Sequence, residues 1–192
     1  MGILSIKKNI ILGSKSPRRK ELLKLMGFRF KTQALNVEES YPKSLSPIKI
    51  ALFLSKKKAN SYNISSKDLL ICADTLVYKQ NNIFEKPKSN KDAVRMLKLL
   101  SNQRHFVVTG VTIKTKEKIL SFYDRSIVYF KKLTKQEISF YVNYHHPLDK
   151  AGGYGIQDWI GLIGIRKITG SFYNVMGLPT HKLYKKIQEI SV

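Results

Sequence analysis

The apolar run Leu69-Leu70-Ile71-Cys72-Ala73 limits the fold of this chain more than any other stretch. A continuously apolar strand is buried on both faces, as in α/β sheets that helices cover on both sides. The run stops at Asp74, where a carboxylate is costly unless a cation or a metal balances it. Ligand sites form at the ends of central strands. Asp74 is therefore the first candidate site residue, and an aspartate that caps a turn is the alternative.

A second pattern lies between a short apolar run at residues 10–12 and a helical pattern, in the segment Ser14-Lys15-Ser16-Pro17-Arg18-Arg19. Ser16 is suited to cap a helix, Pro17 to be its first residue, and Gly27 to end it. A helix N-terminus favours acidic residues, yet Arg18 and Arg19 occupy this one. A strand, a small-residue turn and a basic helix start predict a phosphate-binding site. Two solvated surface arginines are the alternative.

Two acids and a lysine are further candidates. Glu38 and Glu39 follow a strand predicted over residues 28–32. Lys58 lies near the end of a helix predicted from Ser46-Pro47 to about residue 59, on its partly apolar face. The ordinary interpretations are a solvated loop for the acids and, for the lysine, a cation that complements the helix dipole.

The stretch from Asp149 to Asp158 holds three glycines in four positions. Glycine permits close approach of the backbone to a ligand, and Gln157 carries the donor and the acceptor needed to read the edge of a base. A plain tight turn is the alternative. Further on, residues 162–168 and Phe172–Met176 predict a closing hairpin.

Length, charge and cysteine content bound the function. A chain of 192 residues is one large domain or two small lobes. Its formal net charge of +22 favours anionic ligands, but the lysines are spread along the sequence, so we do not expect a nucleic-acid partner. No apolar run is long enough to span a membrane. The single cysteine, Cys72, excludes an internal disulfide framework and suits a reducing cytoplasm, where we expect the protein to be.

Taken in order, these motifs resemble the Maf family of nucleoside triphosphate pyrophosphatases, also called septum-formation inhibitors. The resemblance runs from about residue 10 to residue 184. The motifs that carry it are Ser14-x-Ser16-Pro17-Arg18-Arg19, Ala73-Asp74-Thr75, Glu85-Lys86-Pro87, Thr109-Gly110-Val111, Asp149-Lys150-Ala151-Gly152-x-Tyr154-x-Ile156-Gln157 and Gly177-Leu178-Pro179.

The resemblance implies one Maf-like domain over residues 1–192. Its fold is expected to be α/β, a mixed elongated sheet with flanking helices in two lobes around a central cleft, similar to the inosine triphosphatases. The expected reaction is metal-dependent hydrolysis of dTTP and UTP to the monophosphate and pyrophosphate by a homodimer, with a possible link to the arrest of cell division.

The same resemblance assigns roles to single residues. Asp74 takes the catalytic position, and we hypothesise that it accepts the proton of the attacking water. Glu39 and Asp74 would hold Mg²⁺ or Mn²⁺. The positions that bind substrate are Ser14, Arg18, Arg19, Lys58, Thr75, Lys86 and Gln157. Among these, the positions that set base specificity are Arg18, Thr75 and Gln157.

One departure from the family pattern affects the choice of base. The family usually has glycine after the glutamine, whereas this chain has Asp158 followed by Trp159. An acid and a bulky ring there are expected to narrow the pocket or to shift base preference. Two other functions stay open at this point: a pyrophosphatase for 7-methyl-GTP or a modified pyrimidine triphosphate, and a basic protein that binds nucleic acid or regulates division.

Overall fold

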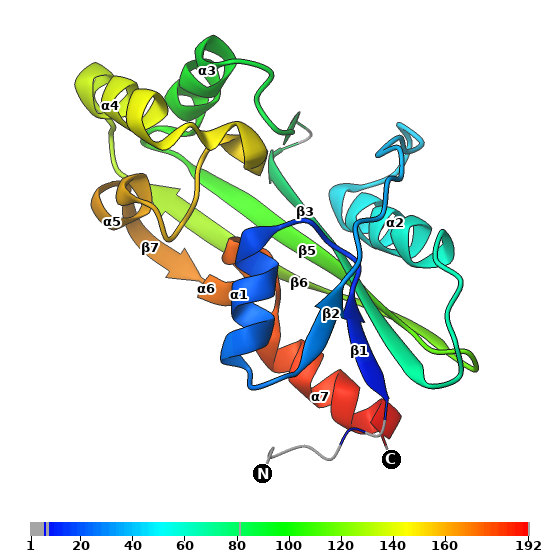
Figure 1. The fold of residues 1–192 in the computed structure, drawn as a ribbon. Coiled ribbons are helices and arrows are strands. Elements are labelled where there is room, and N and C mark those ends of the chain that lie inside the picture. Colours follow the sequence, from blue (N-terminus) through cyan, green and yellow to red (C-terminus); the bar gives the residue numbers. More distant parts are fainter. Residues whose placement is uncertain (1–5, 7, 81, 192) are drawn as a thin grey trace. The chain divides into compact units, whose positions relative to one another are not determined.

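The computed structural model describes residues 6, 8–80 and 82–191 and shows a mixed α/β fold, as predicted (Figure 1). The strands are β1 (Asn9–Leu12), β2 (Phe30–Thr32), β3 (Asp68–Lys79), β4 (Asn82–Phe84), β5 (Arg104–Lys114), β6 (Ile119–Phe130) and β7 (Ile165–Thr169). The helices are α1 (Pro17–Leu25), α2 (Pro47–Asn60), α3 (Asn90–Leu100), α4 (Lys135–His145), α5 (Trp159–Gly164), α6 (Phe172–Met176) and α7 (Thr180–Ser191), with short 3₁₀ turns η1 (Pro147–Asp149) and η2 (Ala151–Gly153).

The described strands form a seven-stranded mixed sheet in the order β2-β1-β3-β5-β6-β7, with β4 paired to β3. Strand β1 runs parallel to both β2 and β3, and its Leu12 pairs with Ile71. Strand β4 is antiparallel to β3, and β7 is antiparallel to β6. Every residue of β3 from Leu69 to Asp74 is buried, so the prediction of a strand covered on both faces is confirmed.

The chain divides into two compact units. The first comprises the described residues up to Asp74, Thr109–Asp124 and the chain from Gly177 onward. The second comprises Thr75–Val108 and Arg125–Met176. The division falls within β3, directly after Asp74.

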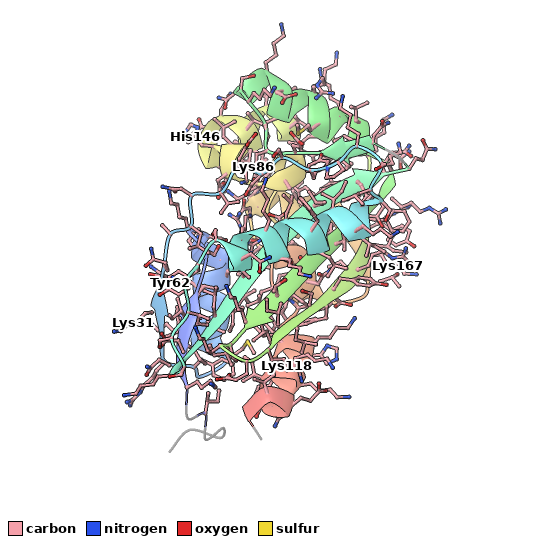
Figure 2. The ribbon with its side chains drawn as sticks, turned by 90° about the vertical axis from the view of Figure 1, so that its right-hand side faces the viewer. Lys31, Tyr62, Lys86, Lys118, His146 and Lys167 are labelled. Atoms are coloured by element: carbon pink, nitrogen blue, oxygen red, sulfur yellow. The ribbon has the colours of Figure 1, made fainter. Side chains whose placement is uncertain are left out.

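In the first unit, α2 packs tightly against β5. Gly110 lies directly beneath the backbone of Ala51, and the hydroxyls of Ser55 and Thr112 are 2.9 Å apart. At the other end of α2, Lys114 Nζ donates to the carbonyl oxygen of Ala59 at 3.0 Å. Helices α1 and α7 lie on the opposite face of the strands from α2 (Figures 1 and 2). The strands of this unit are therefore covered on both sides.

Residues 172–176 form the short helix α6, so the predicted closing hairpin is wrong. Strand β7 pairs with β6 instead. Side-chain hydrogen bonds favour the helical turn: Ser171 Oγ accepts from the backbone N–H of Asn174, and Asn174 Nδ2 donates to the carbonyl oxygen of Val107 at 3.1 Å. Such local bonds compete with a strand pattern.

A buried histidine, His105, packs against the hydrophobic cluster of the second unit, which includes Val77, Phe84, Phe130 and Tyr154. His105 packs against the ring of Phe130, and its Nε2 lies 2.7 Å from the hydroxyl of Tyr154. Burial, assisted by the charge of Lys79, lowers the pKa of His105 to about 3. The imidazole is therefore neutral in the folded protein at pH 7. No local sequence pattern marks this contact, because Tyr154 lies 49 positions away in the chain.

This histidine makes the folded state sensitive to acid. Its pKa rises to about 6.5 when unfolding exposes it, so between pH 7 and pH 4 the unfolded chain binds a proton that the folded protein does not. The expected loss of stability from this group is on the order of 3 kcal/mol. In His105→Gln, the free energy of unfolding should fall less steeply over this range. Urea unfolding at pH 7, 5 and 4 measures how the free energy of unfolding of the wild type and of His105→Gln depends on pH. His181→Gln, which replaces an exposed histidine, is the control. Equal pH dependence of the wild type and His105→Gln would refute the assignment.

Candidate active site

The start of α1 has the geometry that the sequence predicted. Ser16 caps the helix by accepting from the backbone N–H of Arg19 at 3.5 Å, and Pro17 is the first helical residue. Ser14 Oγ accepts from the backbone N–H of Ser16 at 3.2 Å, which fixes the turn between β1 and α1. Arg18 and Arg19 therefore stand in the first helical turn, beside backbone N–H groups that lack intrahelical partners. An anion is well suited to this position.

The guanidinium of Arg19 is held by two atoms of the same unit. Its Nε donates to the carbonyl oxygen of Gly177 at 2.9 Å, and its Nη1 donates to Ser14 Oγ at 3.3 Å. Burial lowers the pKa of Arg19 below its ordinary value, the charges of Asp74 and Glu39 raise it, and Arg18 lowers it further. An arginine stays protonated despite such shifts. These residues therefore form one charged cluster.

Lys58 forms ion pairs with both acids of that cluster, Asp74 and Glu39. Its Nζ lies 2.5 Å from Asp74 Oδ1 and 2.7 Å from Glu39 Oε1. Asp74 is only 6% exposed, whereas Glu39 is an exposed loop residue. A buried carboxylate needs such a counter-charge, because an unpaired charge there would be strongly destabilising. The interpretation of Asp74 as a turn cap is therefore replaced by that of a buried ion pair.

Local structure explains why these three side chains meet. Asp74 is the last residue of the buried stretch that begins at Leu69 in β3, and Lys58 lies in the last turn of α2. The neighbouring Lys57 donates to the carbonyl oxygen of Ser40 at 3.2 Å and to its hydroxyl at 3.0 Å, which anchors the loop that carries Glu39. Of the two adjacent acids, Glu39 is thus the one that contacts Lys58.

Three predicted site residues belong to the second unit: Thr75, Lys86 and Gln157. Lys86 is exposed in the loop after β4, and Figure 2 labels it. The preceding Glu85 accepts a hydrogen bond through its carbonyl oxygen from the backbone N–H of Gly152 at 3.1 Å. The loop of Lys86 therefore lies beside the glycine-rich segment that leads to Gln157. Their participation in one site with the cluster of the first unit stays a prediction.

Asp158 points toward the interior of the second unit. Its Oδ2 accepts a hydrogen bond from the hydroxyl of Tyr141 at 2.6 Å, and its Oδ1 accepts one from Gln157 Nε2 at 2.8 Å. Lys150 Nζ lies 3.6 Å from Oδ2. Trp159 packs against the hydrophobic cluster and against the ring of Phe140. Neither Tyr141 nor the carbonyl of Gly177 was identified as a site contact from the sequence, since no local pattern marks them.

The first-unit acids suit a hard divalent cation. Glu39 and Asp74 contact the same ammonium group, that of Lys58, so the two carboxylates lie close to one another. Mg²⁺ commonly binds through one or two carboxylates together with substrate phosphates and water. Among the described residues, no group of three or more His, Cys, Asp and Glu side chains could hold a metal ion. Two carboxylates are too few to hold a cation alone, so a metal ion here would also need oxygen ligands from phosphate and water.

The chain belongs to the Maf family, because the family model described as "Maf-like protein" matches residues 9–190. It is 49% identical over 183 residues to the "dTTP/UTP pyrophosphatase" of Cytophaga hutchinsonii, an alignment that covers 95% of this chain and 84% of that protein. It is 45% identical over 188 residues to the protein of the same name in Porphyromonas gingivalis, covering 95% and 94%.

Among solved structures, the Ham1 protein of Staphylococcus aureus matches with a TM-score of 0.43 and 13% identity, covering 64% of this chain and 72% of that one. A likeness this distant carries no argument about the site. As for membranes, each helix in the described part of the chain is too short or too polar to cross a bilayer.

Proposed function

We propose that this protein is a nucleoside triphosphate pyrophosphatase that hydrolyses dTTP and UTP to the monophosphate and pyrophosphate. Membership of the Maf family and the names of the relatives support the proposal. The structural observation that carries it is the ion pair of Lys58 with the buried Asp74, set in one cluster with the arginines that begin α1. Cations and acids gathered together suit a small triphosphate, whereas binding of a polynucleotide calls for cations without acids.

In the proposed reaction, the side chains of the first unit neutralise charge and accept a proton. Water attacks the α-phosphorus, the bond from that phosphorus to the α–β bridging oxygen breaks, and pyrophosphate leaves with the bond electrons. Asp74 accepts the proton of the attacking water. Arg18, Arg19 and Lys58 stabilise the charge that develops on the phosphate oxygens.

Ser14 positions Arg19 for this task through their hydrogen bond. From the second unit we assign Lys86 to the phosphates, and Thr75 and Gln157 to the base. Glu39 and Asp74 would hold Mg²⁺ or Mn²⁺, which when bound supplies Lewis-acid neutralisation of the phosphates.

A nucleotide panel tests the reaction. Release of pyrophosphate is measured from dTTP, UTP, CTP, GTP, 7-methyl-GTP and ITP, with Mg²⁺ or Mn²⁺ present and with a chelator. We expect dTTP and UTP to be hydrolysed fastest, and chelation to lower the rate at least about 100-fold because phosphate neutralisation is lost. Faster release from 7-methyl-GTP would replace the substrate assignment, and no release from any nucleotide would overturn the proposal.

We further infer that the enzyme works in the cytoplasm as a homodimer, without a nucleic-acid partner. The buried single thiol of Cys72 is consistent with a reducing compartment. The lysines are spread along the sequence, and Lys31 and Lys118 of the first unit lie at separate places in Figure 2. Sedimentation tests the dimer, and a salt titration with duplex DNA or RNA tests for polynucleotide binding.

A further inference from the structure

We propose that Asp158 is a positioning residue that orients the side-chain amide of Gln157, so that its oxygen Oε1 is presented to the nucleobase. This orientation would select bases with a ring N–H over bases with a bare ring nitrogen at the same place. The inference rests on the proposed function, because it concerns the base of the same substrate. All the residues that carry it belong to the second unit.

The first observation concerns the side-chain amide of Gln157: its nitrogen has a hydrogen-bond partner, and its oxygen has none among the described residues. Gln157 Nε2 donates to Asp158 Oδ1 at 2.8 Å. Gln157 Oε1 is shielded from water and finds no hydrogen-bond partner among the described residues. The hydrogen-bond network decides which way an amide points, and a carboxylate only accepts, so the NH₂ group must face Asp158. The oxygen is left as a buried acceptor that a ligand N–H would satisfy.

The second observation is that the Asp158 carboxylate is itself fixed. Its other oxygen, Oδ2, accepts from the hydroxyl of Tyr141 at 2.6 Å and lies 3.6 Å from Lys150 Nζ. Burial and the charge of Asp158 raise the pKa of Tyr141, so the phenol remains a donor. A Cβ at Gly155 would lie 2.5 Å from Oδ2, so only glycine leaves room for this carboxylate. The orientation of Gln157 thus depends on a carboxylate with little freedom to turn.

The chemistry of the pyrimidines then predicts which base is preferred. Uracil and thymine carry an N–H at ring position 3, between two carbonyl groups, whereas cytosine has a bare acceptor nitrogen there. Oε1 accepts a hydrogen bond from the former and faces a lone pair of the latter. Because UTP and CTP have nearly the same size, the contrast isolates the hydrogen bond. We expect kcat/KM for UTP to exceed that for CTP by roughly 10- to 100-fold.

Asp158→Asn tests the orientation directly. The donors Tyr141 and Lys150 hold the asparagine oxygen on their side, so its NH₂ group faces Gln157 and the amide of Gln157 must turn over. Gln157 would then present a donor, which suits cytosine. The ratio of kcat/KM for UTP over CTP should fall at least about tenfold. Asp158→Ala, which removes the anchor altogether, should also lower the ratio and serves if the asparagine variant does not fold.

Tyr141→Phe is the matched control, since it removes a different bond from the same carboxylate and leaves the bond to Gln157. It should lower stability but keep the UTP-to-CTP ratio, because Lys150 still contacts the carboxylate and either of its oxygens can only accept from Gln157. A merely structural role of Asp158 predicts the same for Asp158→Asn, and an unchanged ratio there would overturn the inference.

Calorimetry of UMP and CMP binding to the wild-type protein measures base recognition in the absence of turnover. A preference for UMP that Asp158→Asn loses supports the inference even if no nucleotide is hydrolysed, in which case only the proposed reaction fails. Equal binding of UMP and CMP by an enzyme that hydrolyses UTP would overturn the inference and leave the reaction standing.

Discussion

Asp74→Asn is expected to lower kcat for UTP by about 10²- to 10⁴-fold, the usual contribution of a positioned general base. Asparagine keeps the size of the side chain but cannot accept the proton of the attacking water. The variant should remain folded, because Lys58 keeps Glu39 as a partner. Steady-state release of pyrophosphate measures the loss, and circular dichroism checks the fold.

The same substitution at Asp68, the first residue of β3, is the control. Asp68 accepts hydrogen bonds from Ser65 Oγ at 2.6 Å and from Asn9 Nδ2 at 3.2 Å, within a surface-exposed network. Asp68→Asn should leave kcat close to that of the wild type. If Asp74→Asn were as active as Asp68→Asn, the assignment of the catalytic carboxylate would be wrong.

Gly110→Ala is expected to destabilise the protein by about 3 kcal/mol or more, at the upper end of overpacking effects. A Cβ at this position would lie 2.4 Å from the carbonyl carbon and oxygen of Ala51 and 2.7 Å from the backbone nitrogen of Leu52. These are backbone atoms of α2, so a side-chain rotation cannot relieve the clash. Unfolding in guanidinium chloride gives the loss of stability.

The added methyl group at position 110 should push α2 away from β5, and this should also impair activity because α2 carries Lys58. Gly27→Ala is the control in the same unit: a Cβ there meets nothing within 4 Å, and the cost arises only from its φ of +81°. That cost should be about 1 kcal/mol. Equal stability of the two variants would contradict the close packing of α2 on β5.

Regular patterns made the first part of the site predictable. The run that ends at Asp74, the cap at Ser16 and the helical position of Lys58 each follow from local spacing, and the structure confirms their placement. The choice between Glu38 and Glu39 did not follow, since it depends on how a loop packs on α2. At Phe172–Met176 a strand-like sequence became a helix because the buried Asn174 and Ser171 bond to nearby atoms.

In the second unit, too, local sequence patterns did not predict the contacts of a key side chain. The sequence marked Gln157 and the departure at Asp158, and predicted that the acid narrows the pocket or shifts base preference, but it did not show what the acid contacts. In the structure Asp158 accepts a hydrogen bond from Tyr141, which lies 17 positions earlier in the chain. Pairings of this kind depend on tertiary packing, which periodicity does not encode.

The hydrogen bond from Arg19 to the carbonyl of Gly177 spans 158 positions of the chain. During synthesis, the segment from Gly177 onward leaves the ribosome long after α1, and contacts between distant segments form slowly. An unfinished chain would therefore carry Arg19 without the atom that orients it. By this reasoning, nascent chains would acquire affinity for nucleotides only after the segment from Gly177 onward has been synthesised and has folded against α1, which would keep partly folded intermediates from sequestering triphosphates.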